Sequence, residues 1–182
     1  SGGYMTLYEY QPAVAGYYDG VTYCHKQLIN ACTPWNGYYT LDSGYYMNLH
    51  FSQFMDKGWS FIYDACYGDA KVGGDGHALV DAKYSYITAC SAEGDYSTII
   101  TNTTSEPITY NFEIANLAKA DNEVYVWETR GPDEGQEYNA NYFKKISTVT
   151  PENGKYSVTI KPYSMITVST LNISEPEFDV PQ

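Results

Sequence analysis

The sequence predicts a mainly β protein: an antiparallel β-sandwich preceded by a short α/β segment. The second half of the 182-residue chain alternates apolar and polar residues, and turn sequences recur about every ten residues. The first 58 residues differ, because they combine a short apolar run, a loop and a helix-start signal. Residues 1–58 and 59–171 are therefore expected to be separate units. The acidic, proline-containing stretch 172–182 is expected to be a linker.

The N-terminal segment begins with two short elements. Gln11-Pro12 followed by AVAGYY predicts a short helix with proline in its first turn, ending at Asp19-Gly20. Residues 26–32, KQLINAC, predict a short buried strand.

Residues 45–54 fit a helix and a strand about equally well. One helical face would hold Tyr46, Leu49, His50, Gln53 and Phe54. One strand face would hold Met47, Leu49 and Phe51. Asp42 or Ser43 favours the helix, because either side chain can accept a hydrogen bond from the first free amide groups. On such an apolar face, His50 is expected to be a hydrogen-bonded structural residue.

About seven or eight short strands are expected after residue 58. Alternation is clearest at 108–114, 124–127, 156–160 and 165–170, and further candidates are 59–66, 77–80, 84–89 and 96–101. Turn sequences such as Asn153-Gly154 and Lys161-Pro162 separate them. This pattern is typical of two packed antiparallel sheets.

The amino-acid composition limits the classes of molecule that this chain could bind. The net charge is −12 with ten basic residues, which argues against nucleic acid and against anionic membrane surfaces. No apolar run approaches the length of a membrane span. The 21 tyrosines suit half-buried sheets and wet binding surfaces, so a neutral glycan is the expected partner. An extracellular, multi-module bacterial protein fits this composition.

The sequence predicts no metal and no cofactor. Cys24, Cys32, Cys66 and Cys90 form no CxxC motif; reduced, buried thiols are the favoured interpretation, and all three disulfide pairings stay open. The glycine-rich loop 67–81 contains three aspartates but lacks the spacing of a calcium loop, so it is interpreted as a hairpin connection.

Arg130 and Trp35 are the side chains best suited to bind a ligand. Arg130, the single arginine, follows a tryptophan-bearing strand and enters a long polar loop. Its guanidinium could bind sugar hydroxyls or carboxylates, or could form an ion pair with Glu128, Asp133 or Glu134. Trp35 could stack on a sugar or serve in packing.

Two motifs carry a family resemblance. Residues 34–39 read PWNGYY and residues 50–59 read HFSQFMDKGW. With the tyrosine-rich stretch before them, they resemble the barrel-to-sandwich junction of the galactosylceramidase family, glycoside hydrolase family 59. That family has Pro-Trp-Ser-Gly-His-Tyr at the first motif and H-x-x-Q-F-x-x-P-G-W at the second. The resemblance runs from Leu7 to Leu171, and VYVWETRG and KPYSMITVSTL are similar to the family's sandwich strands.

The resemblance implies a fold for each part. Residues 1–58 would be the last β/α unit of a (β/α)8 barrel, with 26–35 as the eighth strand and 43–54 as the last helix. Residues 59–171 would be the sandwich that packs against the barrel.

The resemblance also implies a sugar pocket. Trp35, at the C-terminal end of the expected strand, would line a galactose pocket, and Arg130 would reach the pocket from the sandwich. Asn36, Tyr38 and Trp127 are further candidate substrate-binding residues. No catalytic residue is predicted, because the family's two catalytic glutamates lie on earlier barrel strands without a counterpart here.

Two functions are therefore expected. The chain is either the non-catalytic C-terminal portion of a β-galactoside hydrolase, partnered by the rest of a TIM-barrel domain, or a carbohydrate-binding module of a secreted plant-polysaccharide-degrading protein. A spacer without a ligand is a third option. A helix at 45–54 favours the first function and a strand favours the second.

Overall fold

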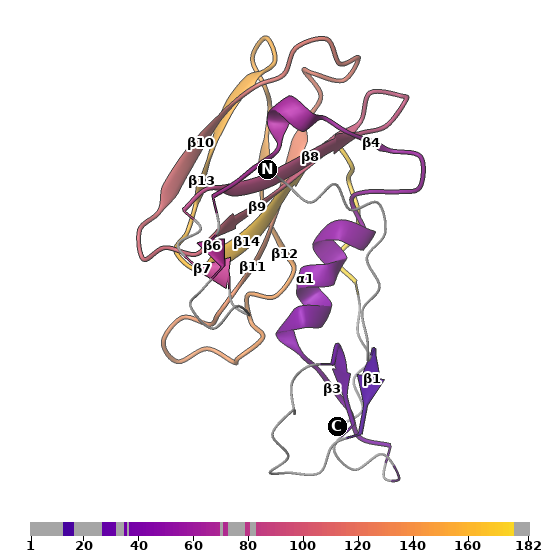
Figure 1. The fold of residues 1–182 in the computed structure, drawn as a ribbon, viewed down its shortest axis with the longest axis vertical. Helices are drawn as coiled ribbons and strands as arrows, with labels where there is room; N and C mark the ends of the chain where they lie inside the picture. The colour runs from indigo at the N-terminus through magenta and orange to yellow at the C-terminus, as the bar shows by residue number, and fades with distance from the viewer. Residues whose placement is uncertain are drawn as a thin grey trace.

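The computed structural model in Figure 1 describes residues 13–16, 27–31, 35, 37–69, 71–72, 79–80 and 83–176. It confirms a mainly β fold with antiparallel sheets and one α-helix among the described residues. In chain order the elements are β1 (Val14–Ala15), β2 (Ile29–Asn30), β3 (Thr40–Leu41), α1 (Ser43–Ser52), β4 (Ser60–Phe61), a 3-10 turn η2 (Tyr63–Ala65), β5 (Tyr67–Gly68), β6 (Lys71–Val72), β7 (Leu79–Val80), β8 (Ser85–Cys90), β9 (Tyr96–Asn102), β10 (Ile108–Glu113), β11 (Val124–Arg130), β12 (Lys144–Val149), β13 (Lys155–Ile160) and β14 (Ser164–Ser169).

Two sheets form the sandwich. The larger has the strand order β12-β11-β14-β9-β8-β4, with β5 also paired to β8, and the smaller consists of β10 and β13. β10 and β13 form the left-hand layer in Figure 1. Both strands alternate between buried and exposed residues as the sequence predicts, since only their inner face meets a partner. The core between the sheets consists of Tyr96, Ile100, Val124, Val126, Tyr156, Val158, Ile160, Ile166 and Val168.

Helix α1 packs against the other face of the large sheet (Figure 1). Its contacts form a second core of Leu41, Tyr46, Leu49, Phe54, Trp127 and Phe143. Because successive residues of a strand point to opposite faces, Val126 joins the first core and Trp127 the second. The middle strands β11 and β14 are therefore buried on both faces, and their burial does not alternate.

The structure confirms the predicted helix. Tyr46, Leu49 and His50 are its buried residues, and Phe54 is buried just beyond its end, whereas Gln53 is exposed. Asp42 occupies the N-cap position with an extended backbone, but its side chain makes no capping hydrogen bond. Its carboxylate instead accepts a hydrogen bond from Gln27 Nε2 at 3.1 Å, which ties the start of the helix to the preceding segment.

One prediction for the N-terminal segment was wrong. Val14–Ala15 is a strand, not part of a helix, and it pairs in parallel with β2. Pairing with β2 satisfies backbone groups that a short, isolated helix would satisfy only weakly. Gln11, Pro12 and Asp19-Gly20, which would flank that helix, lie outside the described residues. β2 confirms a strand within 26–35, and β3 pairs with it in antiparallel fashion.

Other differences concern short or exposed elements. The predicted strand 59–66 is divided into β4 and the 3-10 turn. β12, which the sequence pattern did not predict, is an edge strand exposed on both faces over most of its length. The predicted linker 172–182 begins with a packed residue, because Ile173 lies against the second core.

Candidate functional site

The long loop after Arg130 meets helix α1. This 131–143 loop joins β11 to β12, and its residues Tyr142 and Phe143 contact the helix residues Tyr46 and His50. The candidate site is built at this junction, where the segment before the sandwich and the sandwich itself come together.

Arg130 is held by two carboxylates. Its Nε donates to Glu128 Oε1 at 2.9 Å, and its Nη1 and Nη2 donate to the two Asp133 oxygens at 2.7 and 2.6 Å. Hydrogen bonding to Asp133 raises the pKa of Arg130, and the same contact lowers the pKa of the Asp133 carboxyl. Glu128 is buried, and Lys161 Nζ lies 3.6 Å from it. The structure thus shows the ion pair with Glu128 and Asp133, and sugar contact by Arg130 stays a prediction.

Trp127 is not a glycan-binding residue, so this prediction was wrong. Its side chain is 0% exposed, and its ring lies 4.9 Å from the Phe143 ring and 5.8 Å from the Phe54 ring. The helix covers the face of β11 that the sequence pattern alone would leave open. A ring enclosed in this way has no face left on which a sugar could stack.

The other predicted aromatic residues lie at the surface. Trp35 is 70% exposed and Tyr38 is 48% exposed, while Asn36 lies outside the described residues. Tyr38 is close enough to Tyr138 of the loop to contribute, after burial, to raising the pKa of Tyr138. The structure therefore brings Tyr38 to the loop that Arg130 begins.

Five tyrosines lie at the junction of α1 and the 131–143 loop: Tyr38, Tyr45, Tyr46, Tyr138 and Tyr142. The ring centroids of Tyr46 and Tyr142 are 5.0 Å apart, and those of Tyr138 and Tyr142 are 6.2 Å apart. Burial raises the pKa of Tyr46, and the neighbouring Tyr138, Tyr45 and Tyr142 raise it further. The sequence pattern placed Tyr46 on the apolar face of the predicted helix, but it indicated no binding role for Tyr46, Tyr138 or Tyr142. The only available signal was the presence of two tyrosines in the polar loop after Arg130.

His50 holds both ends of the loop. Its Nε2 lies 2.8 Å from Thr129 Oγ1, and the same hydroxyl oxygen accepts a hydrogen bond from the Phe143 N–H at 3.0 Å. Its Nδ1 lies 2.8 Å from Thr167 Oγ1. Burial lowers the pKa of His50 to about 3, so the ring is neutral and can donate from one nitrogen and accept at the other. The prediction of a hydrogen-bonded structural histidine is confirmed.

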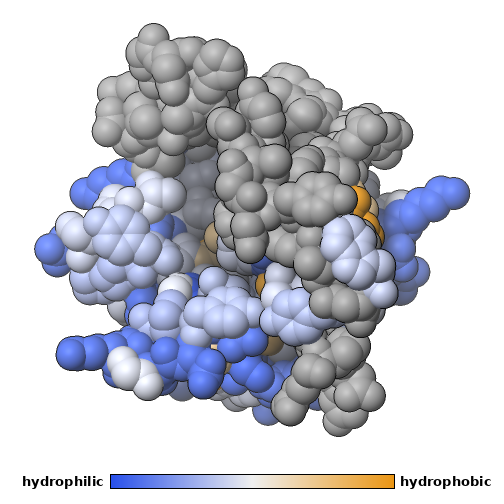
Figure 2. All heavy atoms as spheres, turned by 90° about the horizontal axis from the view of Figure 1, so that it is seen from below, coloured by the Kyte–Doolittle hydropathy of each residue, from blue (hydrophilic) through white to orange (hydrophobic). Residues whose placement is uncertain are grey.

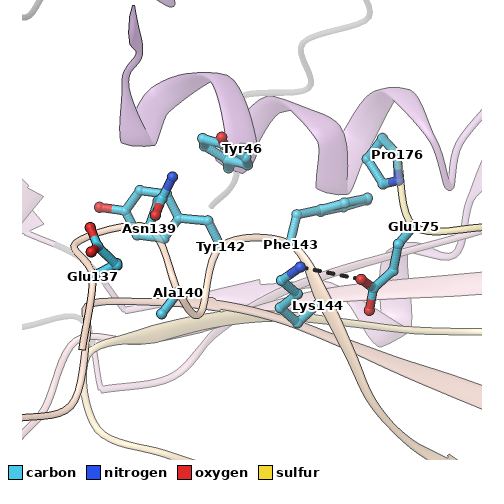
Figure 3. Close-up of a pocket in the computed structure, with 9 residues that line it drawn as sticks. All are labelled: Tyr46, Glu137, Asn139, Ala140, Tyr142, Phe143, Lys144, Glu175 and Pro176. Atoms are coloured by element: carbon cyan, nitrogen blue, oxygen red, sulfur yellow. Dashed lines mark hydrogen bonds and ion pairs between the residues drawn. The ribbon is translucent and has the colours of Figure 1, made fainter. Parts of the chain in front are cut away.

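A cavity of about 450 Å³ lies between α1, the loop and the C-terminal segment (Figure 3). Its lining consists of Tyr46, Glu137, Asn139, Ala140, Tyr142, Phe143, Lys144, Glu175 and Pro176. In Figure 3, Glu137 and Asn139 lie at one end, and Lys144 and Glu175 lie toward the other. Lys144 Nζ and Glu175 Oε2 form an ion pair at 3.2 Å.

The described residues seen from the β1 and β3 end of the molecule are mostly hydrophilic. Figure 2 views the molecule from that end, and the described residues there are largely blue, with small hydrophobic areas between them. Such a surface suits a ligand rich in hydroxyl groups better than an extended apolar one.

Neither metal ligands nor a membrane helix occur in the part of the chain that the structure describes. No group of three or more His, Cys, Asp or Glu side chains is placed to hold a metal ion within the described ranges. No helix among these residues has the length and apolar character needed to cross a membrane. Cys66 and Cys90 are free, half-buried thiols, while Cys24 and Cys32 lie outside the described residues.

Comparison with known proteins confirms the resemblance to the galactosylceramidase family. The chain is 25% identical to galactocerebrosidase of Salmo salar over 178 residues, which is 92% of this chain and 26% of that protein. It is 34% identical to human galactocerebrosidase over 79 residues, which is 43% of this chain and 11% of that protein. The chain thus resembles the C-terminal part of these proteins, and it spans about a quarter of the length of the first relatives. No family model matches it.

Solved structures of two glycoside hydrolases share this fold. A family 30 endoxylanase from Clostridium papyrosolvens superposes with a TM-score of 0.51 at 13% identity, over 71% of this chain and 28% of that chain. A family 30 subfamily 8 xylanase from Clostridium acetobutylicum has a TM-score of 0.51 at 16% identity, over 75% of this chain and 29% of that chain. Together with the sequence matches, this relates the chain to glycoside hydrolases.

Proposed function

We propose that this chain is the non-catalytic C-terminal portion of an extracellular β-galactoside hydrolase, supplying scaffold and one wall of the sugar pocket. The observation that carries the proposal is that residues 43–52 form a helix docked on the sandwich. A helix at this position was the feature expected of the enzyme portion and not of a binding module.

The N-terminal elements support the same interpretation. β1 and β2 are parallel, as neighbouring strands of a (β/α)8 barrel are, and α1 follows β2 after the short antiparallel strand β3. In this proposal residues 1–58 complete a barrel, 59–171 form the sandwich beside it, and 172–182 lead away. Trp35 and Tyr38 would then contact a galactoside from the barrel mouth, and Arg130 would help to position the loop beside them.

The alternative is a carbohydrate-binding module in a protein that degrades plant polysaccharides. The exposure of Trp35 and Tyr38 favours it, because exposed aromatic rings can stack on the C–H face of a sugar without a barrel. It does not explain why the match to galactocerebrosidase begins before the sandwich and includes the helix.

The proposal is tested by assaying two proteins on a chromogenic β-galactoside. The 182-residue chain should show no turnover, because retaining hydrolysis requires two carboxyl groups about 5 Å apart and the proposal places both outside this chain. The whole parent protein should hydrolyse the substrate, and Trp35→Ala in it should lower kcat/KM by about tenfold or more. Turnover by the 182-residue chain would contradict the proposal.

A further inference from the structure

We propose that the cavity between α1 and the 131–143 loop is a binding site for a short neutral oligosaccharide, made entirely by this chain. The site does not use Trp35 or Arg130, and it does not require a barrel to complete it. The proposed site can therefore be tested independently of the function proposed above.

The cavity has the size and the construction of a ligand site. Its volume of about 450 Å³ lies within the range of about 300–1,000 Å³ found for small-molecule pockets. Three separate segments form it: α1 supplies Tyr46, the loop supplies Tyr142 and Phe143, and the C-terminal segment supplies Pro176 (Figure 3). The buried contacts of Tyr46 and Phe143 keep two of these walls fixed.

The lining offers apolar groups for the C–H faces of a sugar and polar groups for its hydroxyls. The half-buried rings of Tyr142 and Pro176 are apolar surfaces suited to the C–H faces of pyranose rings, while Phe143, which is 2% exposed, supports the wall from behind. The Glu137 carboxylate accepts hydrogen bonds, and the Asn139 amide both donates and accepts them. These polar groups lie at one end of the cavity in Figure 3, so they can bind hydroxyls while the rings hold the body of the sugar.

Charge selects against acidic ligands. Lys144 is paired with Glu175, which leaves the formal charge of Glu137 unbalanced among the lining residues. The whole chain adds a net charge of −12. A uronic acid or a phosphorylated sugar would be repelled by this negative charge, whereas the binding free energy of a neutral oligosaccharide would not be reduced by it.

Calorimetry and NMR titration of the 182-residue chain test the site. Lactose, cellobiose and xylobiose serve as neutral probes, and a galacturonic acid disaccharide is the acidic comparison. We expect a dissociation constant of about 10⁻⁴ to 10⁻³ M for at least one neutral probe, because a few stacking contacts only modestly exceed the cost of association. Raising the salt concentration should change this affinity by less than about twofold.

Variants assign the binding to the cavity. Tyr142→Ala should weaken binding by about tenfold or more, whereas Tyr142→Phe, which keeps the ring, should retain it within about threefold. Tyr163→Ala is the matched control, since Tyr163 is 67% exposed and does not line the cavity. Glu137→Gln and Asn139→Ala change exposed side chains, so their effect can be measured without loss of the fold.

Three results would overturn the proposal. The first is no binding of any neutral probe at about 20 mM, some twentyfold above the weakest expected dissociation constant. The second is binding that Tyr142→Ala and Asn139→Ala both leave unchanged. The third is preference for the acidic disaccharide, or for a cation such as choline, over all neutral sugars.

Discussion

His50 of α1 and Thr129 at the end of β11 are joined by a hydrogen bond of 2.8 Å, although 79 residues separate them in the chain. The same threonine hydroxyl accepts the Phe143 N–H, so a single helix residue connects to both ends of the 131–143 loop. The second ring nitrogen reaches Thr167 on β14. The helix is therefore attached to the sheet through a polar contact inside an otherwise apolar core.

Replacing His50 should loosen the loop selectively. His50→Ala leaves the Thr129 and Thr167 hydroxyls without this partner and opens a cavity, so unfolding should become easier by at least about 2 kcal/mol. Hydrogen exchange of residues 131–143 should accelerate more than exchange in β10 and β13. Leu49→Ala is the control, because Leu49 is buried in the same helix but is not part of this hydrogen-bond network. Equal acceleration in both variants would show that His50 has no special role in holding the loop.

Acid should destabilise the protein partly through His50. Its folded pKa of about 3 lies below the unfolded value of 6.5, so between these values the unfolded chain binds the additional proton. The contribution of the neutral His50 ring to the free energy of unfolding is fully present above pH 6.5. It is lost as the pH falls toward 3, and the free energy of unfolding then decreases by up to about 1.4 kcal/mol per pH unit. Urea denaturation across this range should show that slope in the native chain and a shallower one in His50→Gln. Parallel curves would contradict the assignment.

The three-layer packing around Trp127 predicts a large effect on stability. Trp127→Ala should cost about 3–5 kcal/mol, because it empties a fully enclosed site between Phe54 and Phe143. Trp35→Ala, at a ring 70% exposed, should change the unfolding free energy by less than about 1 kcal/mol. Chemical denaturation of the two variants measures the difference. Similar losses for both would mean that the second core does not form in solution.

Substituting two turn glycines by alanine distinguishes the cost of backbone strain from the cost of a steric clash. Gly154 has φ +72° and Gly135 has φ +81°, a region that disfavours residues with a Cβ. A Cβ on Gly154 would overlap the Ile114 carbonyl oxygen. Nothing lies within 4 Å of a Cβ placed on Gly135. Gly135→Ala should cost about 1 kcal/mol from strain alone, and Gly154→Ala should cost clearly more. Thermal unfolding measures both, and equal losses would exclude the predicted clash.

The sequence by itself determined the elements that bury one face. β10 and β13 were predictable because each alternates between solvent and the first core, and a period of two records that asymmetry directly. Helix α1 was less certain, because the spacing of its apolar residues fits a helix and a strand about equally well and only Asp42 or Ser43 at its start favoured the helix. The resemblance around Pro34-Trp35 and His50 to Trp59 placed the chain near a family of glycoside hydrolases. Trp35, Tyr38 and Arg130 were predicted as substrate-binding residues and that role stays a prediction, while the ion pair of Arg130 with Glu128 and Asp133 was one of the alternatives that the sequence left open.

Only the tertiary structure decided which surfaces remain open. Docking of α1 buried Trp127, made β14 inaccessible on both faces, and supplied one wall of the open cavity lined by Tyr46 and Tyr142. β12 went unnoticed for the opposite reason, because an edge strand exposed on both faces leaves no alternating pattern. Local periodicity reports how a residue's immediate segment meets its surroundings. It contains no information about a partner more than seventy residues away, such as Phe54 for Trp127, and this long-range packing decides whether a tryptophan is buried or free to bind.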